Sequence, residues 1–367
     1  MKRTTMTPSK PRVLVVAPGR NGRGGIDSVV RLHQSTPLWA EMCDMLSTYD
    51  DRNALRKIWA ALKAYIQSPL ALLRAHIVHV HLAGQISLLR KLPLLALATA
   101  LHRRVIIHVH AASEESLFTK TPRWAWEFAL HSADCVIALS PSWAEIIRRN
   151  AKHTRVVVVP NPVKTFLPSS RNAGEAPRVL YVGKLEARKG FDTLIAAAAI
   201  VLREWPQTEF WFAGHGNLKD AKKQAENLGI EDHVRLLGWV SSSELEDIYD
   251  QVDLFCLPSY NEGVPMSVLE AMSHGLPVIC TRVGGLPDVV KQGSNGMFVE
   301  PGSAESIADM ILHLLREPEL AASLARAGRK TVQESCSLEL VADRLEEIYR
   351  NLSAAPTPVA VGVLHGT

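Results

Sequence analysis

The stretch DLFCLPSYNEGVPMSVLEAMSHGLPVICT, residues 253–281, contains one complete strand–helix–strand unit. DLFCLPS (253–259) and PVICT (277–281) are short apolar runs typical of buried strands, and residues 265–274 between them have a helical pattern. Two strands joined by a crossing helix form a parallel pair. This unit therefore predicts an α/β fold.

The same alternation extends through the rest of the chain. Before residue 253, the second half has strand patterns at 178–183, 209–214 and 233–238. Three helical patterns lie between and after them: one begins at 191, another ends at 227, and the third covers 243–250. The first half has strand patterns at 12–17, 43–49, 77–83, 104–111, 135–140 and 155–160, with helical patterns beginning at 26 and near 54–67, 86–102, 122–132 and 142–150. These strands are rich in Val and Ile without polar alternation, as in parallel sheets covered on both faces.

Two successive arrays of this kind predict two Rossmann-like, doubly wound domains that face each other across a cleft. The first covers residues 1–168, the polar segment SSRNAGEAP (169–177) is the linker, and the second covers 178–336. We expect residues 337–352 to form a C-terminal helix that packs back toward the first domain. We expect 353–367 to be a flexible tail.

Composition excludes several classes of protein. Hydrophobic residues make up 47% of the 367 and charged residues 21%, which is typical of globular chains and not of disordered or fibrous ones. The longest apolar run, near 94–101, is far shorter than the roughly 20 residues of a membrane span. The apolar run after the basic residues 1–12 is too short for a signal peptide. We therefore expect a cytoplasmic protein.

Charge is unevenly distributed. Residues 1–170 hold 23 Lys/Arg and 10 Asp/Glu, a net +13, whereas residues 171–367 hold 18 and 27, a net −9. The first half therefore suits an anionic partner, and nucleic acid, acidic lipid and a phosphorylated substrate all remain open. Two segments, 54–67 and 88–104, mix basic residues with large apolar ones and could lie on anionic lipid. Packing on the sheet is the better explanation for 88–104, and for 54–67 both remain open.

Three loops after strands carry candidate ligand groups. GRNGRGG (19–25) does not fit G-x-G-x-x-G, because Asp27 stands where the last glycine should be. Gly24 and Gly25 would still allow an anion to approach a helix N-terminus, although a turn without a ligand remains open. In YVGKLEARKG (181–190), Gly183 ends a strand, and Lys184 and Lys189 suit a phosphate or pyrophosphate.

The third loop holds two carboxylates eight residues apart. Glu262 lies in the loop, and Glu270 lies in the helix that Pro265 is expected to open. Backbone N–H groups at this helix end can hold a phosphate or a sugar hydroxyl. They belong to Gly263, Val264 and Met266. The carboxylates suit a ligand that also presents hydroxyl groups.

Two H-x-H pairs, His79/His81 and His108/His110, each point to one face of a strand. Such pairs can bind zinc. No carboxylate or cysteine stands at the matching strand ends, so we interpret His79 and His81 as packed core or supporting histidines and predict no metal site.

Residues 257–279 resemble the E-x7-E signature of retaining glycosyltransferases of family 4, which have the GT-B fold. The resemblance extends in the expected order over most of 13–349. It includes the early Gly-Gly loop, LSPSW (139–143), VVVVPNPV, VGKLEARKG, FAGHG and LGWVSSSEL. Lys184 stands where the family often has Arg, which keeps the charge but loses the two-pronged guanidinium.

The resemblance implies a role for each matching residue. Lys184 and Lys189 would hold the donor diphosphate, and Glu262 would bind the hexose near its 3-hydroxyl, helped by loop N–H groups. Glu270 would bind the ribose, and the backbone around Val240 the base. Gly24 and Gly25 would close over the phosphates, and His110 would lie near the sugar and acceptor. The implied catalytic residues are His110, Lys184, Lys189 and Glu262. The implied donor-binding residues are Gly24, Gly25, Gly183, Val240, Gly263, Val264, Pro265, Met266 and Glu270.

These roles predict a retaining hexosyltransferase that uses a nucleoside-diphosphate sugar and needs no metal or other cofactor. Its acceptor would be a glycan, either a polyprenyl-diphosphate-linked oligosaccharide or a growing exopolysaccharide unit. Peripheral contact with the anionic inner face of the plasma membrane is expected, and nucleic acid is not a partner. Three alternatives remain: a GT-B sugar-nucleotide epimerase, a two-domain NAD-dependent dehydrogenase for which Asp50 or Asp51 would bind the ribose, and a noncatalytic nucleotide-sugar binder.

Overall fold

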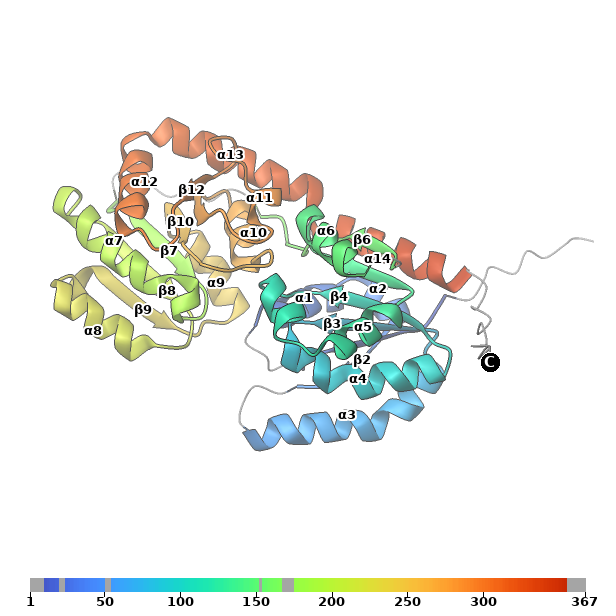
Figure 1. Cartoon of the computed structure of the whole chain (residues 1–367). Coiled ribbons are helices and arrows are strands. Elements are labelled where there is room, and N and C mark those ends of the chain that lie inside the picture. The colour runs from blue at the N-terminus through green and yellow to red at the C-terminus, as the bar shows by residue number, and fades with distance from the viewer. Residues whose placement is uncertain (1–9, 20–23, 50–53, 152–153, 167–174, 355–367) are drawn as a thin grey trace, which may run out of the picture.

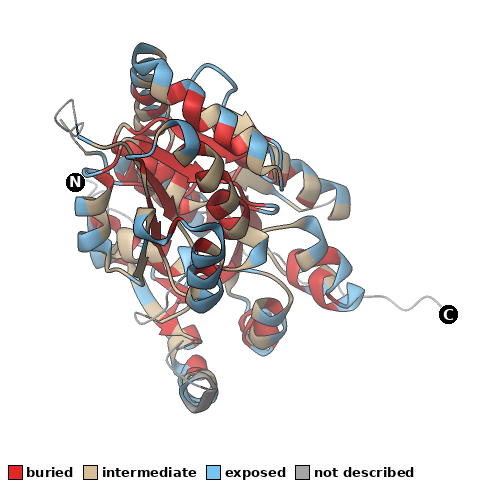
Figure 2. Ribbon diagram, turned by 90° about the vertical axis from the view of Figure 1, so that its left-hand side faces the viewer, coloured by how far each residue is buried: buried red, intermediate tan, exposed pale blue. Residues whose placement is uncertain are grey.

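The computed structural model describes residues 10–19, 24–49, 54–151, 154–166 and 175–354. They form two α/β domains, each built on one parallel six-stranded sheet with helices on its faces (Figure 1), which confirms the predicted fold class. Buried residues are concentrated in the strands and the inner helix faces (Figure 2). Most of the expected linker and tail lies outside the described residues, as do Asp50, Asp51 and residues 20–23.

The N-terminal sheet has the strand order β2-β1-β3-β4-β5-β6. Its strands are β1 (Val13–Ala17), β2 (Cys43–Ser47), β3 (Ile77–Leu82), β4 (Arg104–Val109), β5 (Cys135–Ala138) and β6 (Val156–Val158). Its helices are α1 (Gly25–Gln34), α2 (Pro37–Met42), α3 (Ala54–Arg74), α4 (Gln85–Ala100), α5 (Arg123–His131) and α6 (Pro141–Asn150), with a π-helical turn at Glu115–Thr119. Strand order reverses between β1 and β3.

The C-terminal sheet has the order β12-β11-β10-β7-β8-β9. Its strands are β7 (Arg178–Val182), β8 (Glu209–Ala213), β9 (Val234–Gly238), β10 (Leu254–Leu257), β11 (Val278–Thr281) and β12 (Met297–Val299). Its helices are α7 (Phe191–Glu204), α8 (Leu218–Leu228), α9 (Ser242–Tyr249), α10 (Met266–Ser273), α11 (Leu286–Val289), α12 (Ala304–Arg316) and α13 (Pro318–Ser335), with 3-10 turns at Ala187–Lys189 and Glu231–His233. Here the strand order reverses between β7 and β10.

The last helix, α14 (Leu338–Ala354), lies on the N-terminal domain (Figure 1). Its Leu345 and Tyr349 share a buried cluster with Val13 and Val15 of β1. The chain therefore crosses between the domains twice, and the two crossings are bonded to each other. The Val163 N–H donates to the Cys336 carbonyl at 2.8 Å, and the Leu338 N–H donates to the Val163 carbonyl at 2.9 Å.

Helix α3 is longer than the sequence pattern predicted. The expected segment 54–67 continues to Arg74, with Pro69 inside the helix. Proline cannot donate a backbone hydrogen bond to the carbonyl four residues earlier. Instead the Ser68 hydroxyl donates to the Tyr65 carbonyl at 2.9 Å, so the helix continues past the proline. Among the described residues, none of the helices is both long and apolar enough to cross a membrane.

Candidate active site

The two strand-order reversals direct attention to one edge of each sheet. Ligands of doubly wound sheets bind at the carboxyl ends of the strands where the order reverses. In the C-terminal sheet those ends carry the loops after β7 and β10, which hold Lys184 and Glu262. In the N-terminal sheet the loop after β1 leads to Gly24.

Glu262 is the centre of a buried polar group. Its side chain is 5% exposed, and its Oε1 lies 2.5 Å from Lys189 Nζ. The Ser259 hydroxyl donates to the same oxygen at 2.7 Å. The predicted site residues Glu262 and Lys189 are thus in direct contact. Oε1 thus accepts from two donors.

Glycine conformation positions Lys189 beside the β10 loop. Gly190 follows Lys189 with φ +67°, a left-handed conformation that strains other residues. A side chain there would also put Cβ 2.2 Å from the Pro258 carbonyl oxygen. Any other residue at Gly190 would push the lysine loop away from Glu262.

Lys184 has a different partner. Its half-exposed side chain places Nζ 2.9 Å from Glu186 Oε2, and Arg188 lies 2.7 Å from the other Glu186 oxygen. Burial alone would raise the pKa of Glu186, but these two cations outweigh it and lower that pKa. Sequence reasoning missed Glu186, although it stands inside the quoted basic loop.

Glu270 lies on α10, which begins at Met266 with Pro265 as its N-cap, one residue later than expected. The Tyr249 hydroxyl donates to Glu270 Oε2 at 3.1 Å. Burial raises the pKa of Glu270, whereas Tyr249 and the charge of Arg31 on α1 act in the opposite direction. Helix α10 packs beside α1, so Glu270 lies on a helix that borders the N-terminal domain.

The glycine loop of the first domain reaches the N-terminus of α10. A Cβ on Gly25 would lie 3.9 Å from Met266 Cγ. Gly24 is the N-cap of α1, and its N–H donates to Asp27 Oδ2 at 3.2 Å. Asp27, the residue that breaks the dinucleotide fingerprint, therefore caps this helix itself.

Further contacts between the domains surround Gly263 and Val264. A Cβ on Gly263 would lie 2.8 Å from the Ala111 carbonyl oxygen, so only glycine allows this approach. The Asn161 side-chain amide donates to the Val264 carbonyl at 2.8 Å. Sequence reasoning missed Asn161, although it lies in the quoted VVVVPNPV.

A second contact between the domains joins α6 to α11. Both the N–H and the hydroxyl of Ser142 donate to Asp288 Oδ2, at 3.0 and 2.5 Å. Sequence reasoning missed both residues. The glycine pair at 284–285, directly after the strand at 277–281, was a signal that could have located Asp288.

His110 follows β4 and precedes Ala111, so it stands one residue from the Gly263 contact. Its Nε2 is 2.9 Å from His81 Nδ1. Burial, with the charges of His33 and Lys91, lowers the pKa of His110 to about 3, so its ring is neutral at pH 7. The other predicted residues follow strands of the C-terminal sheet: Gly183 comes directly after β7, and half-buried Val240 lies between β9 and α9.

Comparisons with known proteins fit this arrangement. Residues 163–331 match the family model described as "Glycosyl transferases group 1", and residues 9–165 match "Glycosyltransferase Family 4". The chain is similar to a GDP-mannose-dependent alpha-(1-6)-phosphatidylinositol monomannoside mannosyltransferase from Mycobacterium tuberculosis, with 32% identity over 50% of this chain and 49% of that protein. It is also similar to the lipopolysaccharide core biosynthesis glycosyltransferase LpsE from Rhizobium meliloti, with 30% identity over 58% of this chain and 63% of that protein. The matches thus span about half of the first relative's length and less than two thirds of the second's.

Solved structures share the fold. A sucrose-phosphate synthase from Thermosynechococcus elongatus superposes with a TM-score of 0.77 at 22% identity, over 95% of this chain and all of that one. Anabaena Alr3699/HepE, solved in complex with UDP and glucose, superposes with a TM-score of 0.75 at 19% identity, over 94% of this chain and all of that one. Between them, the two family models match residues 9–331. The chain therefore belongs to the family 4 glycosyltransferases of the GT-B fold.

Proposed function

We propose that this protein is a retaining glycosyltransferase that moves a hexose from a nucleoside-diphosphate sugar to a glycan acceptor, either lipid-linked or part of a growing exopolysaccharide. The contact between Lys189 and Glu262 at the strand-order reversal is the observation that carries the proposal. It puts a cation suited to a diphosphate beside a carboxylate suited to sugar hydroxyls. The relatives named above act in glycolipid and lipopolysaccharide synthesis, which supports this class of product.

The lysine supplies the charge that the chemistry needs. As the bond to the sugar breaks, negative charge develops on the departing diphosphate, and a positioned donor stabilises it. An ammonium group has three donor hydrogens, so Lys189 can keep Glu262 and still reach a phosphate oxygen. The N–H groups at the start of α10 add to this stabilisation, so we propose that no divalent cation is needed at the diphosphate.

The carboxylate binds and does not attack. Glu262 Oε1 accepts hydrogen bonds from Lys189 and Ser259, which stabilise its charge and weaken it as a nucleophile. Retention therefore follows from attack of the acceptor on the face that the diphosphate leaves, without a covalent sugar–enzyme intermediate. Glu270 binds the ribose, and His110 lies on the acceptor side as a neutral hydrogen-bonding group.

Helix α3 would hold the protein on an anionic membrane. Six large apolar side chains are exposed along it at intervals of one to four residues, with exposures between 46% and 68%. They are Ile58, Trp59, Leu62, Ile66, Leu70 and Leu73. The opposite side of the helix is buried through Ala64, Ser68 and Leu72. With the net +13 of residues 1–170, this stripe suits acidic lipid. Helix α4, by contrast, buries Leu88, Leu92 and Leu95 against its own domain.

The decisive test is sugar transfer by the purified full chain. Nucleotide sugars are first screened by thermal shift, since a bound ligand raises the unfolding temperature. The stabilising donor, labelled in its sugar, is then incubated with a lipid-linked oligosaccharide fraction and excess chelator. We expect label in the glycan with its anomeric configuration retained. Binding without transfer would leave a noncatalytic binder, and conversion of the sugar without an acceptor would indicate the epimerase.

A further inference from the structure

A cluster of histidines lies inside the N-terminal sheet. The side chains of His79, His81, His108 and His110 stand on one face of the neighbouring strands β3 and β4, with His81 directly opposite His108. The rings form a stack in which neighbouring centroids are 4.2–5.4 Å apart. His79, His81 and His108 are each only 1% exposed. Three buried imidazoles and the half-buried His110 occupy positions that apolar side chains fill elsewhere on this face.

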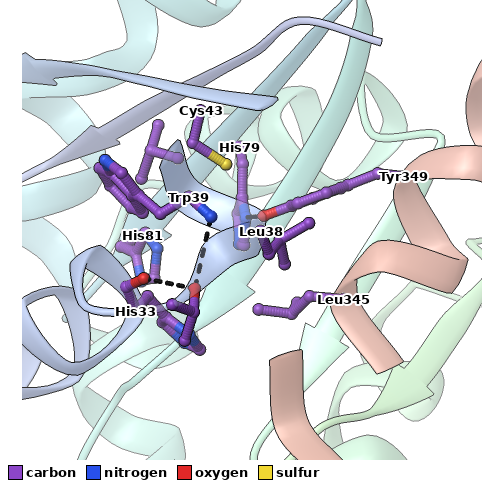
Figure 3. A pocket seen from close by; sticks show the side chains of 10 residues that line it. His33, Leu38, Trp39, Cys43, His79, His81, Leu345 and Tyr349 are labelled. Carbon is purple, nitrogen blue, oxygen red and sulfur yellow. Dashed lines mark hydrogen bonds between the residues drawn. The ribbon is translucent and has the colours of Figure 1, made fainter. Parts of the chain in front are cut away.

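A small cavity adjoins the cluster (Figure 3). Its lining includes His79 and His81 from β3, Cys43 at the start of β2, His33 from α1 and Tyr349 from α14. The room for the centre of a water-sized sphere is about 10 Å³, enough for one water molecule or one ion. Segments far apart in the chain thus bring nitrogen, sulfur and phenol groups to the lining of one small pocket.

Several of these polar atoms have no protein partner. Among the described residues, both ring nitrogens of His33 lack a hydrogen-bond partner, and so does Nε2 of His108. Buried polar groups in folded proteins almost always have a partner, and an unmatched group indicates a missing water or ion. His33 is 5% exposed and lines the same cavity as His79 and His81.

The spacing of the nitrogens fits a metal ion. His79 Nε2 and His108 Nδ1 are 3.3 Å apart, and two imidazole ligands of a tetrahedral zinc ion, with Zn–N about 2.0–2.1 Å, are separated by about 3.3–3.4 Å. One nitrogen from each of His79, His81 and His108 lies within 4.8 Å of the others. An ion at their common centre would be at most about 2.8 Å from each, so ring movements under about 1 Å would complete the bonds.

The outer nitrogens are already held. His79 Nδ1 is 2.7 Å from the Tyr349 hydroxyl, and His81 Nδ1 is 2.9 Å from His110 Nε2. Metal-binding histidines are usually fixed in this way by a partner on the nitrogen that does not face the metal. The Nε2 atoms of both residues are therefore the ones left to bind an ion.

We propose that His79, His81 and His108 form a binding site for a divalent transition metal ion, with zinc as the best match. Imidazole nitrogens suit zinc, copper, nickel and iron, and a three-histidine set leaves a fourth position open. Burial lowers the pKa of all three rings, which keeps them neutral and able to bind a metal at pH 7. The site ties β3 and β4 to α14 through Tyr349. It is separate from the diphosphate site and does not rest on the proposed transfer reaction.

Cobalt binding to the intact protein tests the site. The full chain is stripped with a chelator and titrated with Co²⁺, whose visible absorption is much stronger in a tetrahedral than in an octahedral site. We expect one tetrahedral Co²⁺ per chain, displaced by one equivalent of Zn²⁺, and a higher unfolding temperature with metal. Weak octahedral absorption alone, or no binding, would show that the cluster is only a hydrogen-bonded histidine stack.

Variants locate the ion. His108→Gln should lower affinity by more than about 100-fold, and Tyr349→Phe, which removes only the partner of His79, by about 10-fold. His131→Gln, at an exposed histidine on α5, should leave affinity unchanged. Because His108→Gln alters a fully buried residue, Tyr349→Phe provides the milder test, and thermal unfolding of the metal-free variants checks both. Unchanged Co²⁺ affinity in the folded variants would place the ion elsewhere and overturn the proposal.

Discussion

The two sheets have the same size and all-parallel strands but carry their polar chemistry in different places. In the C-terminal sheet, strands β10 and β11 are buried and apolar apart from one terminal threonine, and the ionisable groups stand in the loops beyond them. In the N-terminal sheet, three histidines lie within the strands themselves. Loop residues can meet a ligand without disturbing the core. Residues inside strands lie behind the carboxyl ends of the sheet where the donor is expected, so the two sheets should respond differently to substitution.

Lys189→Ala should give the largest effect, because it removes the cation assigned to the diphosphate. We expect turnover to fall about 10²–10³-fold, the usual cost of losing one stabilising donor. Glu262 would also remain buried without its cation, so the free energy of unfolding should fall by about 3–5 kcal/mol. Transfer rates and urea unfolding measure both effects.

Lys222→Ala is the matched control for this change, since Lys222 is exposed on α8 and also pairs with a glutamate, Glu226. It should affect neither quantity. Normal turnover of the Lys189→Ala variant would show that the loop after β7 takes no part in the reaction.

Glu262→Gln and Glu270→Gln should fail in different ways. Glu270 is assigned to ribose, so its loss should weaken nucleotide and donor binding alike, by about 1–3 kcal/mol. Glu262 is assigned to the transferred hexose, so its loss should lower turnover and leave the affinity for free nucleotide nearly unchanged. Calorimetric nucleotide affinity and turnover of both variants test this. Equal loss of nucleotide affinity in the two would refute the assignment.

Gly263→Ala should disturb the contact between the sheets. The added Cβ would meet the Ala111 carbonyl oxygen at 2.8 Å, and relieving such an overlap commonly costs 1–3 kcal/mol. We expect a lower unfolding temperature and a turnover reduced by about tenfold or more. Gly25→Ala, whose Cβ would lie 3.9 Å from Met266, is a milder change at the same interface. If both variants behave alike, steric contact at Gly263 is not what positions the domains.

Trp59→Ala should give the smallest effect, a few-fold weaker binding to vesicles that contain acidic lipid, with normal folding. Trp59 is 66% exposed on α3, and Trp124, 64% exposed on α5, provides a matched control. Binding should also weaken with added salt, because exposed charges are screened beyond about 8 Å at physiological ionic strength. Co-sedimentation measures both. Equal binding to neutral and acidic vesicles would show that the positive charge of residues 1–170 plays no part in membrane binding.

Short-range patterns predicted the fold well, because each strand–helix unit consists of about 30 consecutive residues. The loops of the candidate site were also visible, since each follows a strand. The side-chain partners of the site residues could not be predicted, because they depend on which residues lie close together in three dimensions. Nothing in the sequence indicates that Lys189 contacts Glu262 whereas Lys184 contacts Glu186.

The histidine cavity shows the same limit more clearly. His33, Cys43 and Tyr349 come from α1, β2 and α14, and no spacing rule connects them to the H-x-H pairs. The sequence therefore offers no reason to group them, and the metal site proposed above goes against the expectation that none exists.

The return of α14 to the first domain has a consequence for folding during synthesis. The strands of the N-terminal sheet are complete at Val158, but the helix that covers one of its faces ends only at Ala354. At 5–20 residues per second, the ribosome needs about 10–40 s to make the intervening chain. Throughout that interval the part of this face that α14 covers stands open to chaperones and to other nascent chains. The N-terminal domain begins first and finishes last, because its final helix is made after the whole C-terminal sheet.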